Sequence, residues 1–377
     1  MNLVFVFPFC SPEVNSISGG PVYLGSSGHN VLVITAQHAR SLKGEVTAPA
    51  HETISNTEFF RPYRETGDIL KRPGICWQEV REKVSGFRAD AVIGFGEFNY
   101  RLPLLISREF SLPYIVYMEY LRLEKIGFPM RGRTTLKKVA PLIHDWLAGL
   151  FIRYLMRQVA AIMYAYYADA AYAGKIERQG VPVHYVPWCT DVGLEACSAQ
   201  RDRKAGIYIG SIDGFKNAAE LVRAIPLILE KTATDTFTVI GPGEYAGEVK
   251  SLVARYGGRL KYIESVPREE AMRLLCASGY GYTPVKDCGL GFIGDCWGTG
   301  TPLVTTHNLG GFLNPGVDAL VANDCESLPG VINGLLDSDS LYEGLQRDGR
   351  ARYNADYTAK AVGERYLGIV DRIIEGG

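Results

Sequence analysis

The sequence from Tyr282 to Thr306, YTPVKDCGLGFIGDCWGTGTPLVTT, carries the most informative pattern of the chain. A strand-like lead-in is followed by a glycine-spaced turn, a helical pattern from about Leu290, and a Gly-x-Pro before a second β-branched run. Two acids, Asp287 and Asp295, border the turn and the helical pattern. A helix N-terminus has unpaired backbone N–H groups and a partial positive charge, so it suits a phosphate. This stretch is therefore the candidate ligand site.

Composition describes an ordinary globular protein. Hydrophobic residues make up 47% and charged residues 21% of 377 residues, which is enough for two domains with full cores. A formal net charge of −1 gives no reason to expect nucleic acid as a partner. The apolar N-terminal run lacks the features of a signal peptide, and the eight cysteines show no CxxC pair or zinc spacing. We therefore expect reduced thiols and a cytoplasmic protein.

The second half of the chain alternates strand and helix patterns. Apolar runs at 206–210, 237–240, 260–263, 279–284, 303–306 and 319–321 predict strands, and 218–231 predicts a helix. This alternation is typical of a doubly wound parallel sheet. Two of the strand ends carry glycine turns, Gly210-Ser211 and Gly241-Pro242-Gly243, and Lys216 follows where a helix should start. Such turns bring backbone N–H groups close to a phosphate, and a lysine can neutralise it.

The first half predicts a similar sheet from runs at 2–7, 31–35, 89–95, 113–118, 168–173 and 183–186. The pair Gly19-Gly20 lies in a loop after the first run, and Glu97 and Glu119 each follow a strand, where open α/β sheets place ligands. Residues 40–85 are expected to be irregular, and 134–168 to form a long helix. A basic stretch from Arg122 to Lys138 is either the solvated flank of that helix or a surface for an anionic acceptor or lipid.

The charged segment 200–204 is the expected linker. The predicted architecture is α/β, with two Rossmann-like doubly wound domains facing a cleft. Their expected bounds are 1–200 and 201–355, with a C-terminal helix from 356–377 returning to the first domain.

The chemistry of the two acids stays open at this point. Each carboxylate can accept hydroxyl hydrogen bonds from a ribose or sugar ring, or the two can act as a general acid/base pair, as in glycosidases. A helix N-terminus lowers a carboxyl pKa, which argues against a raised-pKa acid at Asp287. No HExxH, H-x-x-x-H or DxD pattern indicates a metal.

These residues resemble the family-4 retaining glycosyltransferases of the GT-B fold, most strongly over about 206–366. Family members carry two glutamates separated by seven residues and then Gly-x-Pro, and DCGLGFIGDCWGTGTP matches that frame with aspartates. Gly210-Ser211 with Lys216 matches the family's phosphate motif, and Gly241-Pro242-Gly243 matches its G-x-G. Gly19-Gly20 and 28–31 match two N-terminal motifs. Serine stands where the family usually has arginine, and Glu119 where it often has histidine.

The resemblance implies roles for these residues. Asp295 would bind the nucleotide ribose, and Asp287 the donor sugar hydroxyls. The implied catalytic residues are Lys216, Asp287 and Glu119. The implied acceptor-binding residues are Glu97, Glu119 and Arg122. The implied donor-binding residues are Gly19, Gly20, Ser211, Lys216, Gly241, Gly243, Asp287, Gly289, Leu290, Gly291, Phe292 and Asp295.

The implied activity is metal-independent retaining transfer of a sugar from a UDP- or GDP-sugar to a hydroxyl of a glycan, glycolipid or small metabolite, as in polysaccharide biosynthesis. The nucleotide sugar is a co-substrate, and no cofactor is expected. Two alternatives remain: a GT-B sugar-nucleotide epimerase, and a non-catalytic glycosyltransferase-like partner subunit. The basic stretch adds peripheral contact with the inner membrane face as a further expectation.

Overall fold

The computed structural model describes residues 1–10, 19–41, 44–96, 99–118, 121, 150, 153–165, 167, 170–190, 200–286 and 290–376. The chain divides into two compact units, Met1–Cys189 with Ala359–Gly377, and Thr190–Thr358. The expected domain boundary lay at 200/201 and the expected C-terminal segment began at 356. Among the described helices, none is long and apolar enough to cross a membrane.

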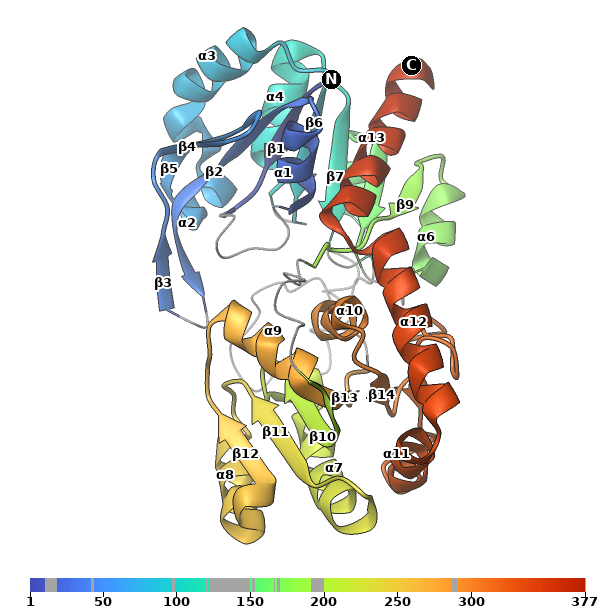
Figure 1. Cartoon of the computed structure of the whole chain (residues 1–377). Helices are drawn as coiled ribbons and strands as arrows, with labels where there is room; N and C mark the ends of the chain where they lie inside the picture. The colour runs from blue at the N-terminus through green and yellow to red at the C-terminus, as the bar shows by residue number, and fades with distance from the viewer. Residues whose placement is uncertain are drawn as a thin grey trace, which may run out of the picture. The chain divides into compact units, whose positions relative to one another are not determined.

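The first unit is a nine-stranded sheet with helices around it (Figure 1). Its strands are β1 (Asn2–Val6), β2 (Asn30–Ser41), β3 (Gly44–Thr47), β4 (His51–Ile54), β5 (Thr57–Glu65), β6 (Ala91–Phe95), β7 (Tyr114–Met118), β8 (Ala161–Tyr164) and β9 (Val183–Tyr185). Its helices are α1 (Gly19–Ser26), α2 (Thr66–Lys71), a 3-10 helix (Pro73–Cys76), α3 (Trp77–Phe87), α4 (Arg101–Phe110), α6 (Ala170–Glu177) and α13 (Ala359–Gly376).

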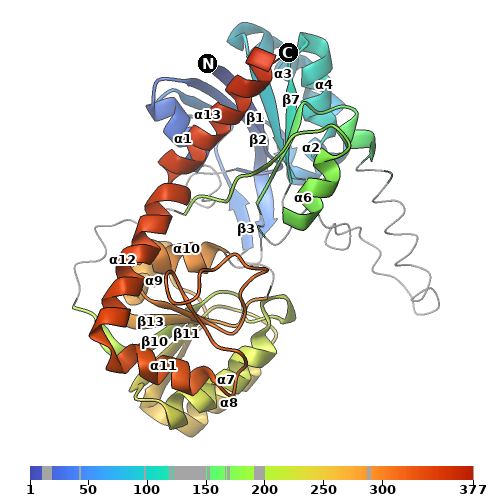
Figure 2. The same ribbon diagram turned by 90° about the vertical axis from the view of Figure 1, so that its right-hand side faces the viewer.

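The strand order of this sheet is β4-β5-β2-β1-β6-β7-β8-β9, with β3 on β2. From β5 to β9 all neighbours are parallel. The order reverses direction between β1 and β6, which is the doubly wound pattern predicted from the sequence. The last helix, α13, packs beside α1, as both ribbon views show (Figures 1 and 2).

The second unit has a six-stranded parallel sheet of order β12-β11-β10-β13-β14-β15. Its strands are β10 (Asp202–Ile209), β11 (Thr236–Ile240), β12 (Leu260–Ile263), β13 (Ser278–Thr283), β14 (Leu303–Thr305) and β15 (Leu320–Val321). Its helices are α7 (Ala218–Lys231), α8 (Ala246–Tyr256), α9 (Arg268–Ala277), α10 (Leu290–Thr299), α11 (Leu328–Asp337) and α12 (Asp339–Asp356), with 3-10 helices at Gly214–Lys216 and Gly257–Arg259. This sheet is also doubly wound, with its reversal between β10 and β13.

The prediction that residues 40–85 are irregular is wrong. They form β3, β4, β5, α2 and α3, and Pro62 lies inside β5. Phe60 pairs with Ile34 and Tyr63 with Ala36, so two residues of β5 oppose one of β2 at a bulge. A proline is tolerated at a bulge because no ladder N–H is needed there. The sequence could not show this partner strand.

Three further boundaries differ from the prediction. Residues 161–164 form β8 although a helix was expected to continue to 168, and 170–177 form α6 where a strand was expected. β8 lies between β7 and β9 in the sheet, and this tertiary pairing overrides the helical pattern. The expected linker at 200–204 is already part of β10 from Asp202, because Lys204 and its neighbours extend the central strand beside β13.

Among the cysteines that the structure describes, one departs from the expectation of reduced thiols. Cys276, buried on α9, is disulfide-bonded, whereas Cys10, Cys76, Cys189, Cys296 and Cys325 are free. A disulfide needs two Cα atoms about 4.4–6.8 Å apart, and that proximity is set by the fold and not by sequence spacing.

Candidate functional site

The candidate site lies at the carboxyl edge of the second unit's sheet. The loops that follow β10, β11 and β13, and the N-terminus of α10, are at this edge, where open α/β sheets bind ligands near the reversal of strand order. α10 begins at Leu290, as the sequence predicted. Gly291 and Phe292 lie in its first turn, so their N–H groups have no acceptor within the helix.

The loops after β10 and β11 are hydrogen-bonded to each other. Gly210 N donates to Ile240 O (2.9 Å) and Ile212 N donates to Pro242 O (2.8 Å). A Cβ atom on Gly241 would lie 1.9 Å from Gly210 O, and one on Gly243 would lie 2.3 Å from Ile212 O. Both glycines also have positive φ, +147° and +157°. Glycine is therefore required at both positions by the close approach of the two loops.

Ser211 and Lys216 lie on the first of these loops. Ser211 O accepts from Tyr208 Oη (2.8 Å), which holds the backbone at the end of β10. The 3-10 helix at Gly214–Lys216 is capped by Asp213, whose carboxylate accepts from Lys216 N (2.9 Å). The ammonium of Lys216 lies over the Phe215 ring at 5.4 Å from its centroid. A half-buried cation thus lies within the loop where the sequence predicted a diphosphate contact.

A polar cluster anchors the start of α7 to the loops after β13 and β14. Asn217 Nδ2 donates to Glu220 Oε2 (2.6 Å) and to Pro284 O (2.9 Å). Glu220 also accepts from Thr306 Oγ1, and its Oε2 lies 3.1 Å from His307 Nε2. Burial alone would raise the pKa of Glu220, but the hydrogen bonds from Thr306, His307 and Asn217 outweigh it, so this pKa is below its usual value. The sequence did not predict this cluster, since its members are far apart in the chain.

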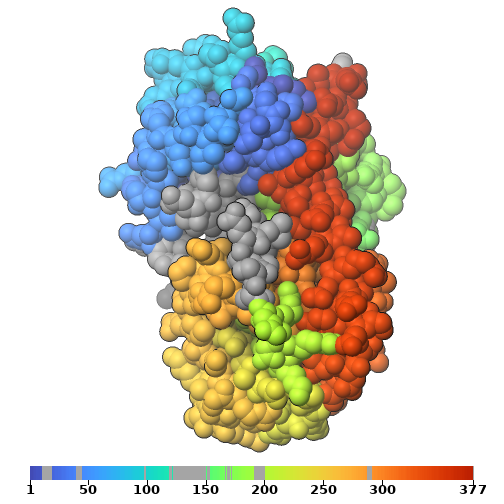
Figure 3. Space-filling model, in the orientation of Figure 1, coloured from blue at the N-terminus to red at the C-terminus, as the bar shows by residue number. Residues whose placement is uncertain are grey.

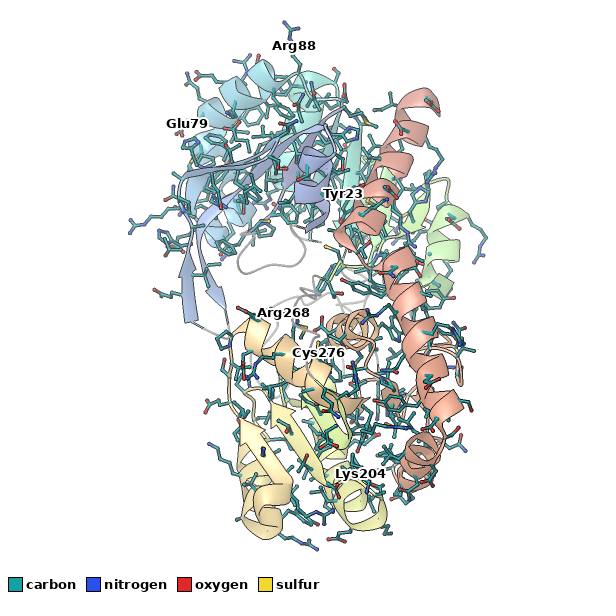
Figure 4. All side chains as sticks on the ribbon, viewed as in Figure 1. Tyr23, Glu79, Arg88, Lys204, Arg268 and Cys276 are labelled. Carbon is teal, nitrogen blue, oxygen red and sulfur yellow. The ribbon has the colours of Figure 1, made fainter. Side chains whose placement is uncertain are left out.

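Asp295 is buried and already paired. It is 4% exposed, and Arg268 at the start of α9 binds both of its oxygens, Nη1 to Oδ2 and Nη2 to Oδ1, each at 2.6 Å. Burial raises the pKa of Asp295, and Arg268 opposes that rise. The Arg268 side chain is 51% exposed. Figure 4 labels it on α9, and α9 reaches the surface in the space-filling view (Figure 3).

The other predicted residues are distributed as follows. Gly19 and Gly20 begin α1 and were expected in a loop. A Cβ atom there would lie 2.8 Å from Cys189 Sγ or 2.7 Å from Tyr366 Cε2, so close packing within the first unit explains both glycines. The remaining positions, Asp287, Gly289, Glu97, Glu119 and Arg122, lie outside the described residues, as does the side chain of Leu290. Their roles stay predictions.

In the part of the chain that the structure describes, no group of three or more His, Cys, Asp or Glu side chains could hold a metal ion.

Two doubly wound units in one chain, with the glycine turns and the helix N-terminus at the carboxyl edge of the second, define the class: the chain has the GT-B glycosyltransferase fold. It is similar to a sucrose-phosphate synthase from Thermosynechococcus elongatus, at 14% identity over 100% of this chain and 99% of that one, with a TM-score of 0.73.

Two other solved structures match at full length. HepE from Anabaena in complex with UDP and glucose matches at 12% identity over 98% and 99% of the two chains, with a TM-score of 0.66. A UDP-forming α,α-trehalose-phosphate synthase from Burkholderia vietnamiensis matches at 12% identity over 100% and 99%, with a TM-score of 0.65. No family model and no curated protein matches the sequence. At these identities the structural matches establish the fold.

Proposed function

We propose that the protein is a retaining glycosyltransferase that moves a sugar from a nucleotide-diphosphate sugar to a hydroxyl of an acceptor. One observation carries this proposal. The loops after β10 and β11 approach so closely that Gly241 and Gly243 are obligatory, and they present Lys216 at the same sheet edge as the N-terminus of α10. That edge offers backbone N–H groups, a helix dipole and a cation, which together suit a diphosphate.

Two of the similar structures support a nucleotide donor, since one contains UDP with glucose and another is of a UDP-forming synthase. We propose UDP as the first nucleotide to test and GDP as the second. Glycans, glycolipids and small metabolites remain the acceptor classes to test.

The proposed chemistry needs no protein nucleophile. The leaving diphosphate would take the acceptor proton while the new glycosidic bond forms on the same face of the sugar. The chain's own residues would then act by positioning the donor and stabilising negative charge on the leaving group. Lys216 and the first turn of α10 would carry that charge stabilisation. Asp287 is proposed to hold the donor sugar hydroxyls, and no metal is required in this scheme.

The proposed role of Asp295 includes its partner. Because both of its oxygens are bound by Arg268, the ribose hydroxyls would meet a carboxylate–guanidinium pair and not a lone carboxylate. The pair still offers a lone pair on each carboxylate oxygen as an acceptor.

Calorimetry with UDP, UDP-glucose, GDP and GDP-mannose tests the proposal, followed by product analysis with glycan and lipid acceptors. Binding of a nucleotide and its sugar with transfer to an acceptor is the expected result. Binding with an epimerised donor and no transfer would make the protein an epimerase. Absence of binding of all four nucleotides would overturn the enzyme proposal in favour of a partner subunit.

A further inference from the structure

A basic hollow lies in the first unit. It has a volume of about 500 Å³ and is formed by α2, the following 3-10 helix, α4 and Tyr154. This volume is within the usual range of small-molecule sites, about 300–1,000 Å³. Among its ten lining residues are the cations Lys71, Arg72, Arg101 and Arg108 and the apolar or aromatic side chains of Leu105 and Tyr154.

The charged side chains that line the hollow are all positive. Four of the ten lining residues are cations and none is an acid. Two described acids near these cations in the sequence already have partners: Asp68 pairs with Arg72, and Glu109 pairs with Arg81 at 2.6 Å. The lining therefore has a surplus of positive charge that no described carboxylate offsets.

Three of the four cations have no carboxylate partner among the described residues. Arg101 Nη1 donates to the backbone carbonyl of Lys71 (3.1 Å), and Arg108 Nη2 donates to the Gln158 amide oxygen (2.9 Å). No described acid pairs with Lys71. A guanidinium bound to a neutral oxygen keeps its full charge and several free N–H donors.

The walls between the cations are aromatic and apolar. The rings of Tyr100 and Tyr154 meet edge to face with their centroids 6.1 Å apart, and the Arg101 guanidinium lies 5.9 Å from the Tyr100 centroid. Leu105 and Tyr154 are 39% and 43% exposed, so both offer apolar surface to the hollow. An organic group could pack on these side chains while its anion meets the cations.

We infer that this hollow binds a phosphate ester, with the phosphate held by Lys71 and Arg101 and the organic part packed on Leu105 and Tyr154. Phosphate is favoured over a carboxylate because it carries up to two charges and more acceptor oxygens, which suits a hollow lined by several cations. A soluble phosphate ester and an anionic lipid headgroup share this chemistry. The inference does not depend on glycosyl transfer.

The test uses the full-length protein and two probes, glycerol 3-phosphate and vesicles of phosphatidylcholine mixed with phosphatidylglycerol. The test variant is Lys71→Gln with Arg101→Gln. The matched control is Arg88→Gln with Arg178→Gln, which removes the same charge from exposed positions of the same unit; Figure 4 shows Arg88 beyond α3. Thermal melting checks that both variants fold.

Binding of either probe should weaken by about 10- to 100-fold in the test variant, because each lost charge-assisted bond accounts for about a tenfold change. The control should bind like the wild type. If the test variant binds glycerol 3-phosphate more weakly, the ligand of the hollow is a soluble phosphate ester. If only its binding to vesicles weakens, the ligand is a lipid headgroup. If neither probe binds the wild type, or if both variants bind alike, the inference is overturned. UDP affinity, measured on the same samples, should not change, which separates this result from the donor site.

Discussion

At the scale of single residues, Lys216 is the cation that the proposed donor site depends on. Its loop is capped by Asp213, and the side chain is half-buried at the sheet edge. Lys216→Ala should weaken UDP binding by about 1–3 kcal/mol, because a charge-assisted hydrogen bond to the diphosphate is lost. Calorimetry measures this. Lys204→Ala is the control, since Lys204 is exposed near the opposite end of β10. Equal affinities of the two variants would remove Lys216 from the site.

Gly241 offers a second test of the same loop. A Cβ atom in Gly241→Ala would lie 1.9 Å from Gly210 O, so the two loops must separate. We expect a loss of stability of roughly 1–3 kcal/mol from strain and overpacking, together with weaker UDP binding.

The control for Gly241 is Gly247→Ala. Gly247 lies on α8 with no atom within 4 Å of the added Cβ, so alanine should be neutral or stabilise by up to about 1 kcal/mol. Urea unfolding of both variants measures the difference. Equal stability of the two would contradict the close approach of the loops.

The lowered pKa of Glu220 predicts a pH dependence. A carboxyl group whose pKa is lower in the folded state stabilises the fold above the unfolded pKa, about 4.3 for glutamate, and this contribution is lost as pH falls through the folded pKa. The unfolding free energy of the wild type should therefore decrease as pH falls below about 5. Glu220→Gln should be less stable at pH 7 and show a flatter dependence in that range. If the unfolding free energies of the wild type and Glu220→Gln change with pH in parallel, the Glu220 carboxylate does not contribute to stability in this way.

At the scale of elements, the Arg268–Asp295 pair joins α9 to α10. The two partners are not equivalent, since Arg268 is 51% exposed and Asp295 only 5% by side chain. Arg268→Ala leaves a buried carboxylate without its partner, at a cost of up to about 3–5 kcal/mol. Asp295→Asn leaves a guanidinium that water can still reach, so it should cost less.

Urea unfolding at pH 7 and pH 5 tests this asymmetry. The loss in Arg268→Ala should shrink at pH 5, because burial already raises the pKa of Asp295 and protonation then removes the buried charge. Adding Asp295→Asn to Arg268→Ala should recover part of the stability at pH 7. A double variant no more stable than Arg268→Ala would contradict the asymmetry.

At the scale of the whole molecule, the C-terminal helix α13 belongs to the first unit although it follows the second in sequence. Tyr366 on this helix is buried, and its ring centroid lies 5.7 Å from Phe5, 6.2 Å from Phe95 and 6.3 Å from Tyr117. The core of the first unit is therefore completed only by the end of the chain.

Tyr366→Ala should destabilise the first unit by about 3–5 kcal/mol, the usual cost of removing a large buried aromatic ring. Scanning calorimetry should show one transition moved to lower temperature and the transition of the second unit unchanged. Ile374→Ala on the same helix is the control, since Ile374 is 44% exposed. A uniform shift of both transitions would show that the two units unfold together.

Much of the fold was predictable because local signals agree with the tertiary structure. The apolar runs of β1, β7, β11 and β12 and the helices α7 and α10 lie where the sequence placed them. Prediction failed where a distant partner decided the outcome. The bulge at Pro62 depends on β2, and the strand β8 depends on pairing with β7 and β9.

Some residues of the candidate site were likewise predictable from the sequence, and others were not. The glycines of the β11 loop, Lys216 and the start of α10 at Leu290 follow from short-range patterns, since turns and helix starts are encoded by adjacent residues. Glu220 and His307 were not predicted because they are 87 residues apart. Hydrogen bonds across that distance exist only once α7 and the loop after β14 are packed together.

The sequence alone thus determined that the chain forms two doubly wound sheets and that a helix begins at Leu290, because hydrophobic periodicity and glycine positions act locally. Only the tertiary structure decided the partner of Asp295, 27 residues away on α9, and gathered the cations of α2 and α4 around one hollow. A buried carboxylate needs a compensating charge, and which cation supplies it depends on the helix that packs beside it.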